Sequence, residues 1–299
     1  MGVKAAGCTL CPRECGADRA VKAGYCGGRD AIKAARAALH MWEEPCISGS
    51  EGSGTVFFSG CSLKCVYCQN GVIARGDAGK EISVQRLAEI FLELRDKGAN
   101  NINLVTGTHY ADRITEALDL AGRNRLGIPV VWNTGGYEKA SVIEMLEPYV
   151  DIYLTDFKYM YPETAARYSG APDYPDTAKK ALAAMMRTKG GAVYDGRGIM
   201  QRGVIIRHLV LPGHTAESME IIKYLYDTYG DGPVLSIMNQ YTPPEGLEGY
   251  PEINRKLTSY EYKKVVDFAL SLGIENAYIQ EGGTAEESFI PDFGTCEGV

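Results

Sequence analysis

The sequence predicts an α/β fold: a partial or near-complete barrel of parallel strands and helices, with a small cysteine-rich extension at its N-terminus. Two observations predict the barrel. From Gly54 onward, apolar runs of strand length alternate with amphipathic stretches of helical length, and such alternation implies a parallel sheet. Residues with reactive, charged or metal-binding side chains stand at the C-terminal ends of successive strands throughout the series, as barrel active-site residues do. An open, doubly wound sheet is the alternative arrangement.

The expected elements follow one another in a regular order. Strands are expected at 54–59, 101–106, 128–134, 151–157, 203–213, 233–241 and 276–280. Helices are expected at 83–98, 111–127, 139–149, 177–191, 215–230 and 259–273. The first helix shows the signals used: Ser83 can cap it, an apolar stripe runs along one face, and Gly98 ends it.

We divide the chain into an extension (1–50), a barrel domain (51–280) and a C-terminal tail (281–299). Four closely spaced cysteines in a Gly-rich stretch set the extension apart. Its second half, 30–45, is rich enough in Ala for a helix but can equally run as an extended cover. The tail is expected to wrap the surface.

Composition limits the classes of binding partner that we expect. A formal net charge of −7 argues against nucleic acid or an anionic membrane, because phosphate binding needs clustered Lys and Arg. No apolar run approaches the ~20 residues of a membrane helix. The first residues lack the apolar core of a secretion signal, so we expect a cytoplasmic protein. Its nine cysteines are then expected to be thiols or metal ligands, not disulfides.

The segment "SGCSLKCVYCQN" (59–70) is the most informative part of the sequence. Cys61, Cys65 and Cys68 have the spacing C-x3-C-x2-C directly after a strand. Thiolates select soft metals and are the usual ligands of iron–sulfur clusters. A 4Fe–4S cluster held by three cysteines leaves one iron free to bind a small molecule. A zinc site completed by a distant His or Cys is the alternative.

"FFSGCSLKCVYCQN" (57–70) resembles the signature of the radical SAM superfamily. The motifs "NINLVTGTHY", "VVWNTGGYE", "DIYLTDFKYM", "IIRHLVLPGH" and "IMNQYTP" resemble the subgroup of pyruvate formate-lyase activating enzyme-like iron–sulfur proteins. The resemblance implies a 4Fe–4S cluster that cleaves S-adenosylmethionine (SAM) reductively to a 5'-deoxyadenosyl radical. It also implies anaerobic chemistry and an electron donor of the flavodoxin or ferredoxin type.

The resemblance assigns roles to further residues. Tyr67 would lie near the adenine of SAM, or is an ordinary core aromatic. Thr106, Gly107, Thr108 and His109 stand where the superfamily usually carries Gly-Gly-Glu for the SAM amine, and the acidic member is missing. His109 is also a candidate proton donor.

Later strand ends complete the expected site. Asn133 and Thr134 end the third barrel strand, and Asp156 with Lys158 the fourth. Lys158 is expected to pair with the SAM carboxylate, or else with a surface acid. Asp156, Thr134 and backbone oxygens are expected to hold a monovalent cation. The remaining candidates, for contacts with ribose, adenine or substrate, are Arg207, Asn239 and Gln240.

The extension carries a second cysteine group with the spacing C-x2-C-x3-C-x10-C. It consists of Cys8, Cys11, Cys15 and Cys26. Four ligands suit structural zinc or a second iron–sulfur cluster, and we favour zinc. The isolated Cys46 and Cys296 are expected to be buried or incidental thiols, and His208 a satisfied core residue.

Three functions are weighed. The first is hydrogen abstraction from a glycine of a protein partner, which activates a glycyl radical enzyme. The second is radical SAM chemistry on a small molecule or another peptide. The third, a non-catalytic iron–sulfur or zinc protein, is disfavoured because a carrier needs neither an open iron nor a barrel of ~250 residues.

Overall fold

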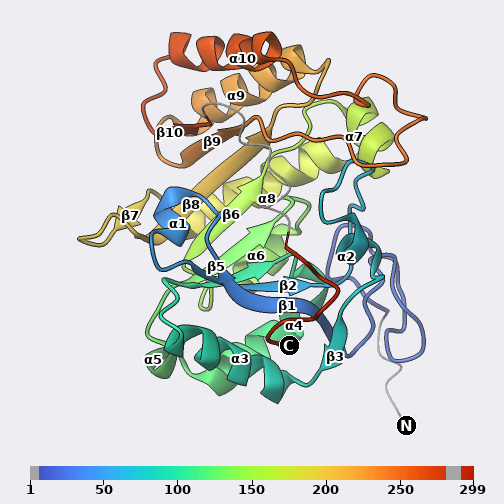
Figure 1. Cartoon of the computed structure of the whole chain (residues 1–299), viewed down its shortest axis with the longest axis vertical. Coiled ribbons are helices and arrows are strands. Elements are labelled where there is room, and N and C mark those ends of the chain that lie inside the picture. The colour runs from blue at the N-terminus through green and yellow to red at the C-terminus, as the bar shows by residue number, and fades with distance from the viewer. Residues whose placement is uncertain (1–6, 281–290) are drawn as a thin grey trace.

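The computed structural model describes residues 7–280 and 291–299. Ten strands of these residues form one curved sheet with the order β10-β9-β8-β6-β5-β4-β2-β1-β3, and β7 is paired only with β8 (Figure 1). The strands are β1 (Ile32–His40), β2 (Ser53–Phe58), β3 (Lys80–Ile82), β4 (Ile102–Val105), β5 (Val130–Thr134), β6 (Ile152–Asp156), β7 (Val193–Tyr194), β8 (Met200–Leu209), β9 (Val234–Met238) and β10 (Ala277–Ile279).

The seven expected strands are all present and mutually parallel, as β2, β4, β5, β6, β8, β9 and β10. β3 and β10 stand at the two ends of the strand order, so the barrel is partial, as predicted. Every residue of β2, β4 and β5 is buried, as expected for parallel strands covered on both faces. β8 begins at Met200 because its first residues form a hairpin with β7, which the sequence did not indicate.

Helices cover the convex side of the sheet, with α3 to α5 near one end and α9 and α10 near the other (Figure 1). The helices are α1 (Pro45–Ser48), α2 (Gly71–Arg75), α3 (Val84–Asp96), α4 (Ala111–Ala121), α5 (Arg123–Leu126), α6 (Ala140–Leu146), α7 (Pro162–Ser169), α8 (Tyr174–Lys189), α9 (Thr215–Tyr229) and α10 (Ser259–Ser271). The predicted cap is present, because Ser83 Oγ accepts a hydrogen bond from Arg86 N at 3.0 Å. The helix expected at 111–127 is divided at Gly122 into α4 and α5.

The ambiguous segment at 30–45 is mostly a strand. β1 pairs antiparallel with β2 on one side and with β3 on the other. The sheet therefore continues across residue 50, where the sequence placed a domain boundary. Residues 281–290 of the predicted tail lie outside the described residues. The end of the tail lies on the sheet: Ala37 donates its backbone N–H to the carbonyl oxygen of Glu297 at 2.8 Å.

The concave side of the sheet is partly filled by the chain itself. Cys46 and Ile47 of α1 are buried against inward-facing strand residues, among them Val131, Leu154 and Ile205. Cys46 is thus the buried thiol that was expected. The short helix therefore fills part of the concave side, and a cavity lies beside the C-terminal ends of the parallel strands.

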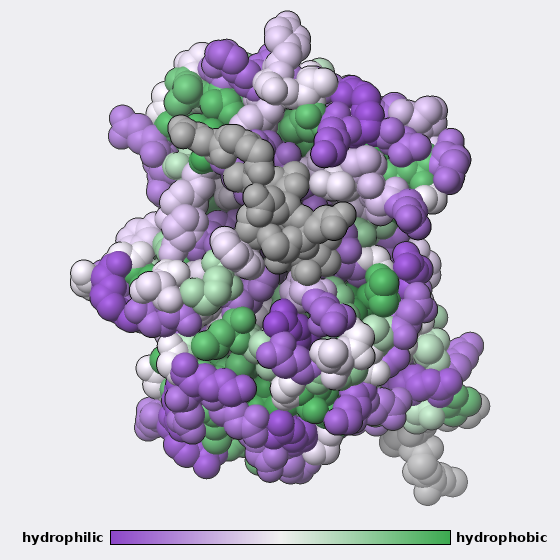
Figure 2. All heavy atoms as spheres, in the orientation of Figure 1, coloured by the Kyte–Doolittle hydropathy of each residue, from purple (hydrophilic) through white to green (hydrophobic). Residues whose placement is uncertain are grey.

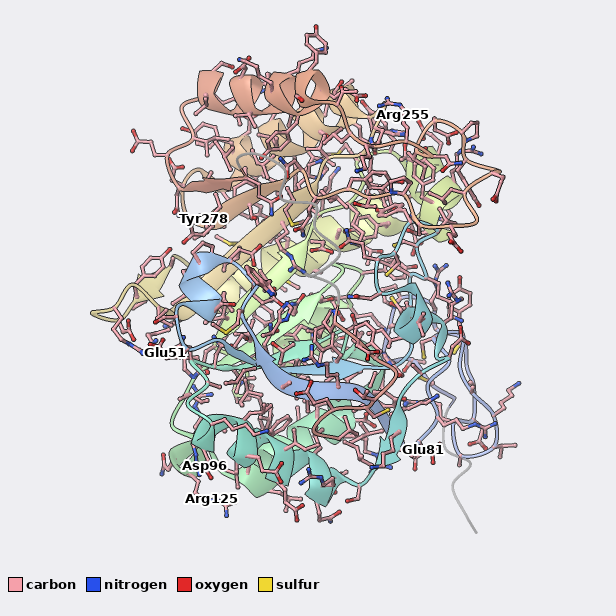
Figure 3. All side chains as sticks on the ribbon, viewed as in Figure 1. Glu51, Glu81, Asp96, Arg125, Arg255 and Tyr278 are labelled. Atoms are coloured by element: carbon pink, nitrogen blue, oxygen red, sulfur yellow. The ribbon has the colours of Figure 1, made fainter. Side chains whose placement is uncertain are left out.

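Polar residues dominate the visible outer surface (Figure 2). Labelled charged residues such as Glu81, Asp96 and Arg255 lie at the periphery of the molecule (Figure 3). Each helix of the described residues is too short or too polar to cross a membrane.

Candidate active site

One cavity of about 250 Å³ lies at the C-terminal ends of the parallel strands. It brings together residues that are more than 170 positions apart in the sequence, from Cys61 to Gln240. Of the predicted site residues, it is lined by Cys61, Cys65, Tyr67, Cys68, Thr106, Thr108, Asn133, Thr134, Asp156, Lys158, Arg207 and Gln240. The structure therefore gathers most of the predicted site around one space.

The loop from Cys61 to Cys68, here called the cysteine loop, follows β2 and forms one wall of the cavity. It leaves the strand through Gly60, whose φ is 97° and where an added Cβ would lie 2.6 Å from the carbonyl oxygen of Cys26. The Ser169 hydroxyl donates to Cys65 Sγ at 3.0 Å. Burial and the neighbouring thiols raise the pKa of Cys68 to about 12, while Lys158 lowers it.

Tyr67 lies in a buried aromatic group behind this loop. Its hydroxyl oxygen is 2.8 Å from that of Tyr159, and its ring meets the rings of Tyr159, Tyr168 and Tyr241 edge-on. Tyr67 is only 6% exposed but still contributes to the cavity wall. Both sequence interpretations of Tyr67, a core aromatic and a ligand contact, are compatible with this position.

The floor of the cavity is a network of charged side chains. Asp156 Oδ2 lies 2.5 Å from Lys158 Nζ, and Asp156 Oδ1 lies 2.9 Å from Arg207 Nε. Arg207 also donates to Asn133 Oδ1 at 2.7 Å and to Glu43 Oε2 at 3.2 Å. Each oxygen of Asp156 thus has one cationic partner, and a monovalent cation held by Asp156 and Thr134 stays a prediction. The partner of Lys158 is a partly buried acid that lines the cavity, not an acid of the outer surface.

A second acid, Glu138, lies beneath Thr108 and Thr134, which line the cavity. Glu138 is 1% exposed, and its Oε1 accepts hydrogen bonds from Thr108 Oγ1 and Thr134 Oγ1, each at 2.5 Å. Its Oε2 makes no close hydrogen bond, although the indole N–H of Trp132 lies near enough to stabilise the carboxylate. Burial raises the pKa of Glu138 to about 6, while bonds from Thr108, Thr134 and Trp132 lower it, so the carboxylate is ionised at neutral pH.

The part of the sequence that forms this site matches a known protein family. Residues 55–225 match the family model described as the radical SAM superfamily. The chain belongs to the radical SAM superfamily. Membership implies a 4Fe–4S cluster and SAM. The residues present fit a 4Fe–4S cluster and SAM. The three thiols of the cysteine loop line one side of the cavity, and the cavity lies open beside them.

Two further comparisons found similar proteins. The chain is 31% identical over 280 residues to uncharacterized protein MJ0674 of Methanocaldococcus jannaschii, a match that covers 91% of this chain and 76% of that protein. Two solved structures of SuiB from Streptococcus suis, one bound to S-adenosylmethionine, align with a TM-score of 0.51 at 16% and 15% identity. They cover 74% and 77% of this chain, which spans 48% of SuiB, and this likeness concerns the fold.

Three predicted residues do not line the cavity of this radical SAM barrel. His109 is 1% exposed, and its Nε2 lies 2.7 Å from the carbonyl oxygen of Ser59. Burial lowers the pKa of His109 to about 4, so the ring is neutral and is turned away from the expected proton-donor position. Gly107 packs against Ile114, where a Cβ would lie 2.7 Å from that side chain. Asn239 donates its backbone N–H to Gln280 Oε1 at 2.8 Å.

His208 is the satisfied core residue that was expected. Its Nδ1 lies 2.8 Å from the carbonyl oxygen of Phe157, and its Nε2 lies 2.9 Å from Ser218 Oγ. Both ring nitrogens therefore have partners away from the cavity. Cys296 is half-buried in the tail.

The N-terminal cysteines lie against the cysteine loop. Cys61 donates its backbone N–H to the carbonyl oxygen of Cys26 at 3.0 Å. Cys11 and Cys26 are buried, and burial raises the pKa of Cys11 to about 12. Within residues 7–280 and 291–299, no three His, Cys, Asp or Glu side chains are already arranged around a single metal ion. A metal shared by the four N-terminal cysteines remains a prediction.

Sequence reasoning missed three acids at this site. Glu43 lines the cavity and accepts from Asn103 and Asn133 as well as Arg207. Glu44 beside it is buried, with Oε2 lacking a partner, and Glu138 lies under the threonines. The adjacent acids before Pro45 were the one available signal, because two acids in an otherwise apolar cover are unusual.

Proposed function

We propose that the three thiolates of the cysteine loop hold the 4Fe–4S cluster of this radical SAM enzyme and that SAM binds in the adjoining cavity. When bound, the cluster supplies one electron to the sulfonium of SAM, which gives methionine and a 5'-deoxyadenosyl radical that takes a hydrogen atom from the substrate. The observation that carries the proposal is the convergence of the three cysteines and the strand-end residues on one cavity.

Lys158, Arg207 and Tyr67 have different roles in this proposal. Lys158, at the cavity wall, has two further ammonium hydrogens to offer a carboxylate beyond the one directed at Asp156. Arg207 is held rigidly by three acceptors, so it shapes the floor and neutralises Asp156 and Glu43. Tyr67 supplies an apolar edge for the adenine.

For the substrate, we propose a glycyl residue of a protein partner, which the radical would convert to a glycyl radical. The resemblance to pyruvate formate-lyase activating enzymes supports this choice. The cavity volume of about 250 Å³ also supports it, because typical pockets for one small ligand measure ~300–1,000 Å³. SAM alone would fill most of this space, which favours a substrate presented at the mouth by a protein or peptide.

The test uses anaerobically reconstituted full-length protein with SAM and dithionite. We expect 5'-deoxyadenosine to form, and the variant without the three loop cysteines to form none. Peptides with a deuterated glycine at the reactive position should pass deuterium into 5'-deoxyadenosine. A full cluster without any SAM cleavage would contradict the enzyme proposal, whereas cleavage without deuterium transfer would contradict only the glycyl substrate.

For the four N-terminal cysteines we propose one structural zinc. Four thiolates at ~2.3 Å would close a tetrahedral site, and the buried Cys11 and Cys26 need a cation to ionise. Metal analysis of the anaerobic protein tests this choice. About four irons and one zinc per chain are expected, whereas about eight irons and no zinc would indicate a second 4Fe–4S cluster.

A further inference from the structure

The last nine residues of the tail, 291–299, here called the strap, are held against the outer edge of β1 (Figure 1). β3 pairs only with Ile32–Ala34, so the rest of β1 has no strand on that edge in the described part of the chain. The strap covers part of this edge, because Ala37 donates its backbone N–H to the carbonyl oxygen of Glu297 at 2.8 Å. The Glu297 carboxylate also accepts from Arg36 Nε at 2.9 Å and from Arg36 Nη2 at 2.7 Å. An open strand edge can pair with other chains, and the strap prevents this at Ala37.

The first residues of the strap reach the cavity. Pro291 lines the cavity, and Phe293, which is 7% exposed, packs edge-on against Phe57 with the ring centres 5.3 Å apart. Phe57 lines the cavity as well, and it lies opposite Val105 in the register of β2 and β4. The strap is thus anchored on β1 at one end and completes the cavity wall at the other.

This part of the cavity lining, here called the apolar wall, consists of His40, Phe57, Val105 and Pro291. The rings of His40 and Phe57 meet edge-on, with their centres 5.9 Å apart. Burial and the neighbouring Arg36 lower the pKa of His40 to about 4, so its ring is uncharged at neutral pH. The apolar wall therefore offers a ligand an uncharged surface, which favours groups that gain free energy by leaving water.

The apolar wall is separate from the residues that we assign to the cluster and SAM. Those residues come from the cysteine loop and from the end of β6, whereas the apolar wall comes from β1, β2, β4 and the strap. The charged side chains of the cavity floor are paired with one another, Glu43 with Arg207 and Asp156 with Lys158. The apolar wall thus has no role in SAM binding in our proposal and is left for a second ligand.

We propose that the apolar wall is the subsite for an apolar side chain of the substrate peptide, next to the residue that loses a hydrogen atom. The inference rests on the proposed function, because it takes the substrate to be a peptide presented at the cavity mouth. In this arrangement Pro291 contacts the substrate side chain directly. Phe293 is a positioning residue, which acts through the Phe57 ring that it supports.

Binding of three capped peptides to the anaerobic, oxidised, SAM-loaded protein, measured by calorimetry, tests the subsite. The peptides are Phe-Gly-Phe, Asp-Gly-Asp and Lys-Gly-Lys, each acetylated and amidated at its ends. Burial of an apolar side chain favours binding on the order of tenfold, so wild type should bind Phe-Gly-Phe about tenfold more tightly than either charged peptide. In Phe293→Ala this preference should fall to about twofold, because the wall loses its support, while the affinity for SAM stays the same.

Matched variants separate recognition from general damage. Phe293→Leu should keep most of the preference, because leucine still fills the space beside Phe57. Lys80→Ala removes another contact of the strap, the 3.2 Å bond from Lys80 Nζ to Val299 O, but Lys80 does not line the cavity, so the preference should stay unchanged.

A variant of the wall itself tests the subsite without disturbing the packing of Phe293. Pro291→Lys places an ammonium group on the apolar wall and should reverse the preference, so that Asp-Gly-Asp binds more tightly than Phe-Gly-Phe. Thermal unfolding of each variant shows whether the protein remains folded. If Phe293→Ala does not fold, an unchanged preference in Pro291→Lys overturns the subsite.

The outcomes distinguish the subsite from the proposed function. Equal binding of the three peptides by wild type, binding of none, or an unchanged preference in Phe293→Ala overturns the subsite. A loss of SAM affinity in Phe293→Ala that equals the loss for Phe-Gly-Phe would place SAM on the wall and also overturns it. Deuterium transfer from the glycine of all three peptides alike overturns the subsite and leaves the proposed function intact. Preferred binding of Phe-Gly-Phe without deuterium transfer overturns the glycyl substrate and leaves the subsite.

Discussion

Replacement of Arg13 by alanine is expected to release the N-terminal cysteine segment from the cysteine loop. The Arg13 guanidinium donates from Nε to the carbonyl oxygen of Ser62 at 2.8 Å, from Nη2 to that of Ser169 at 2.8 Å, and from Nη1 to that of Gly170 at 2.5 Å. It also stacks over Tyr25, 4.3 Å from the ring centre. One side chain between Cys11 and Cys15 thus holds both the residue after Cys61 and the residue that bonds to Cys65.

The magnitude follows from these bonds. A hydrogen bond from a charged donor contributes ~1.5–3 kcal/mol, but three bonds from one half-exposed side chain are not additive. We take about 3 kcal/mol for the set, which corresponds to about a hundredfold change in the equilibrium for local opening. The barrel has its own core and should stay folded.

Hydrogen exchange of the anaerobic protein measures this opening directly. Peptides covering 7–31 and the cysteine loop should exchange about a hundredfold faster in Arg13→Ala, including the Cys61 N–H that bonds to Cys26. Arg29→Ala is the matched control, because Arg29 makes a single exposed bond of 3.2 Å to Val21. Equal exchange in wild type and Arg13→Ala would refute the reasoning, as would global unfolding of the barrel.

Three further predictions concern the cavity. Replacing all three cysteines of the cysteine loop by alanine should remove about four irons per chain and abolish SAM cleavage. The iron is also measured in a variant whose N-terminal cysteines are replaced as well. Retention of about four irons in that variant would contradict the assignment of the cluster to the cysteine loop. Lys158→Ala leaves the partly buried Asp156 with one cation fewer, so we expect a loss of up to about 3 kcal/mol in urea unfolding and weaker SAM binding. Unchanged values for both would return Lys158 to a passive role. The folded-state pKa of Glu138, about 6, lies above its ordinary value of 4.5, so its contribution to stability falls as pH rises through this window. Glu138→Gln should therefore gain about 2 kcal/mol of unfolding free energy relative to wild type between pH 4.5 and pH 7, and a constant difference across this range would contradict the burial argument.

The parallel strands were predictable because most of the apolar runs are buried on both faces and all are flanked by helix signals. β1 was not, because "IKAARAALH" is Ala-rich and carries little of the β-branched residue content that marks strands. Its strand form depends on pairing with β2, β3 and the tail residue Glu297. These contacts are distant in sequence, so no local pattern could reveal them.

The cysteine loop was equally predictable, since its ligands are local and their spacing is constrained. His109 was misplaced because the strand β4 is followed by a single 3-10 turn, Thr108–Tyr110. This turn directs Thr108 to the cavity and His109 toward Gly28, where a Cβ would lie 2.8 Å from the ring. A one-residue difference in such a turn decides which side chain faces the ligand.

Glu138 shows why sequence reasoning missed the acids of the site. In the sequence it is one charged residue after a Gly-Gly turn, a pattern typical of an exposed loop. Only the fold buries it, beneath threonines that come from two different strand ends. Glutamine at this position would remove a buried charge and raise stability at neutral pH, yet it would also remove the carboxylate charge at which both threonine hydroxyls point. The same substitution should therefore stabilise the protein at neutral pH while it frees the hydroxyls of Thr108 and Thr134 to turn toward the cavity that both residues line.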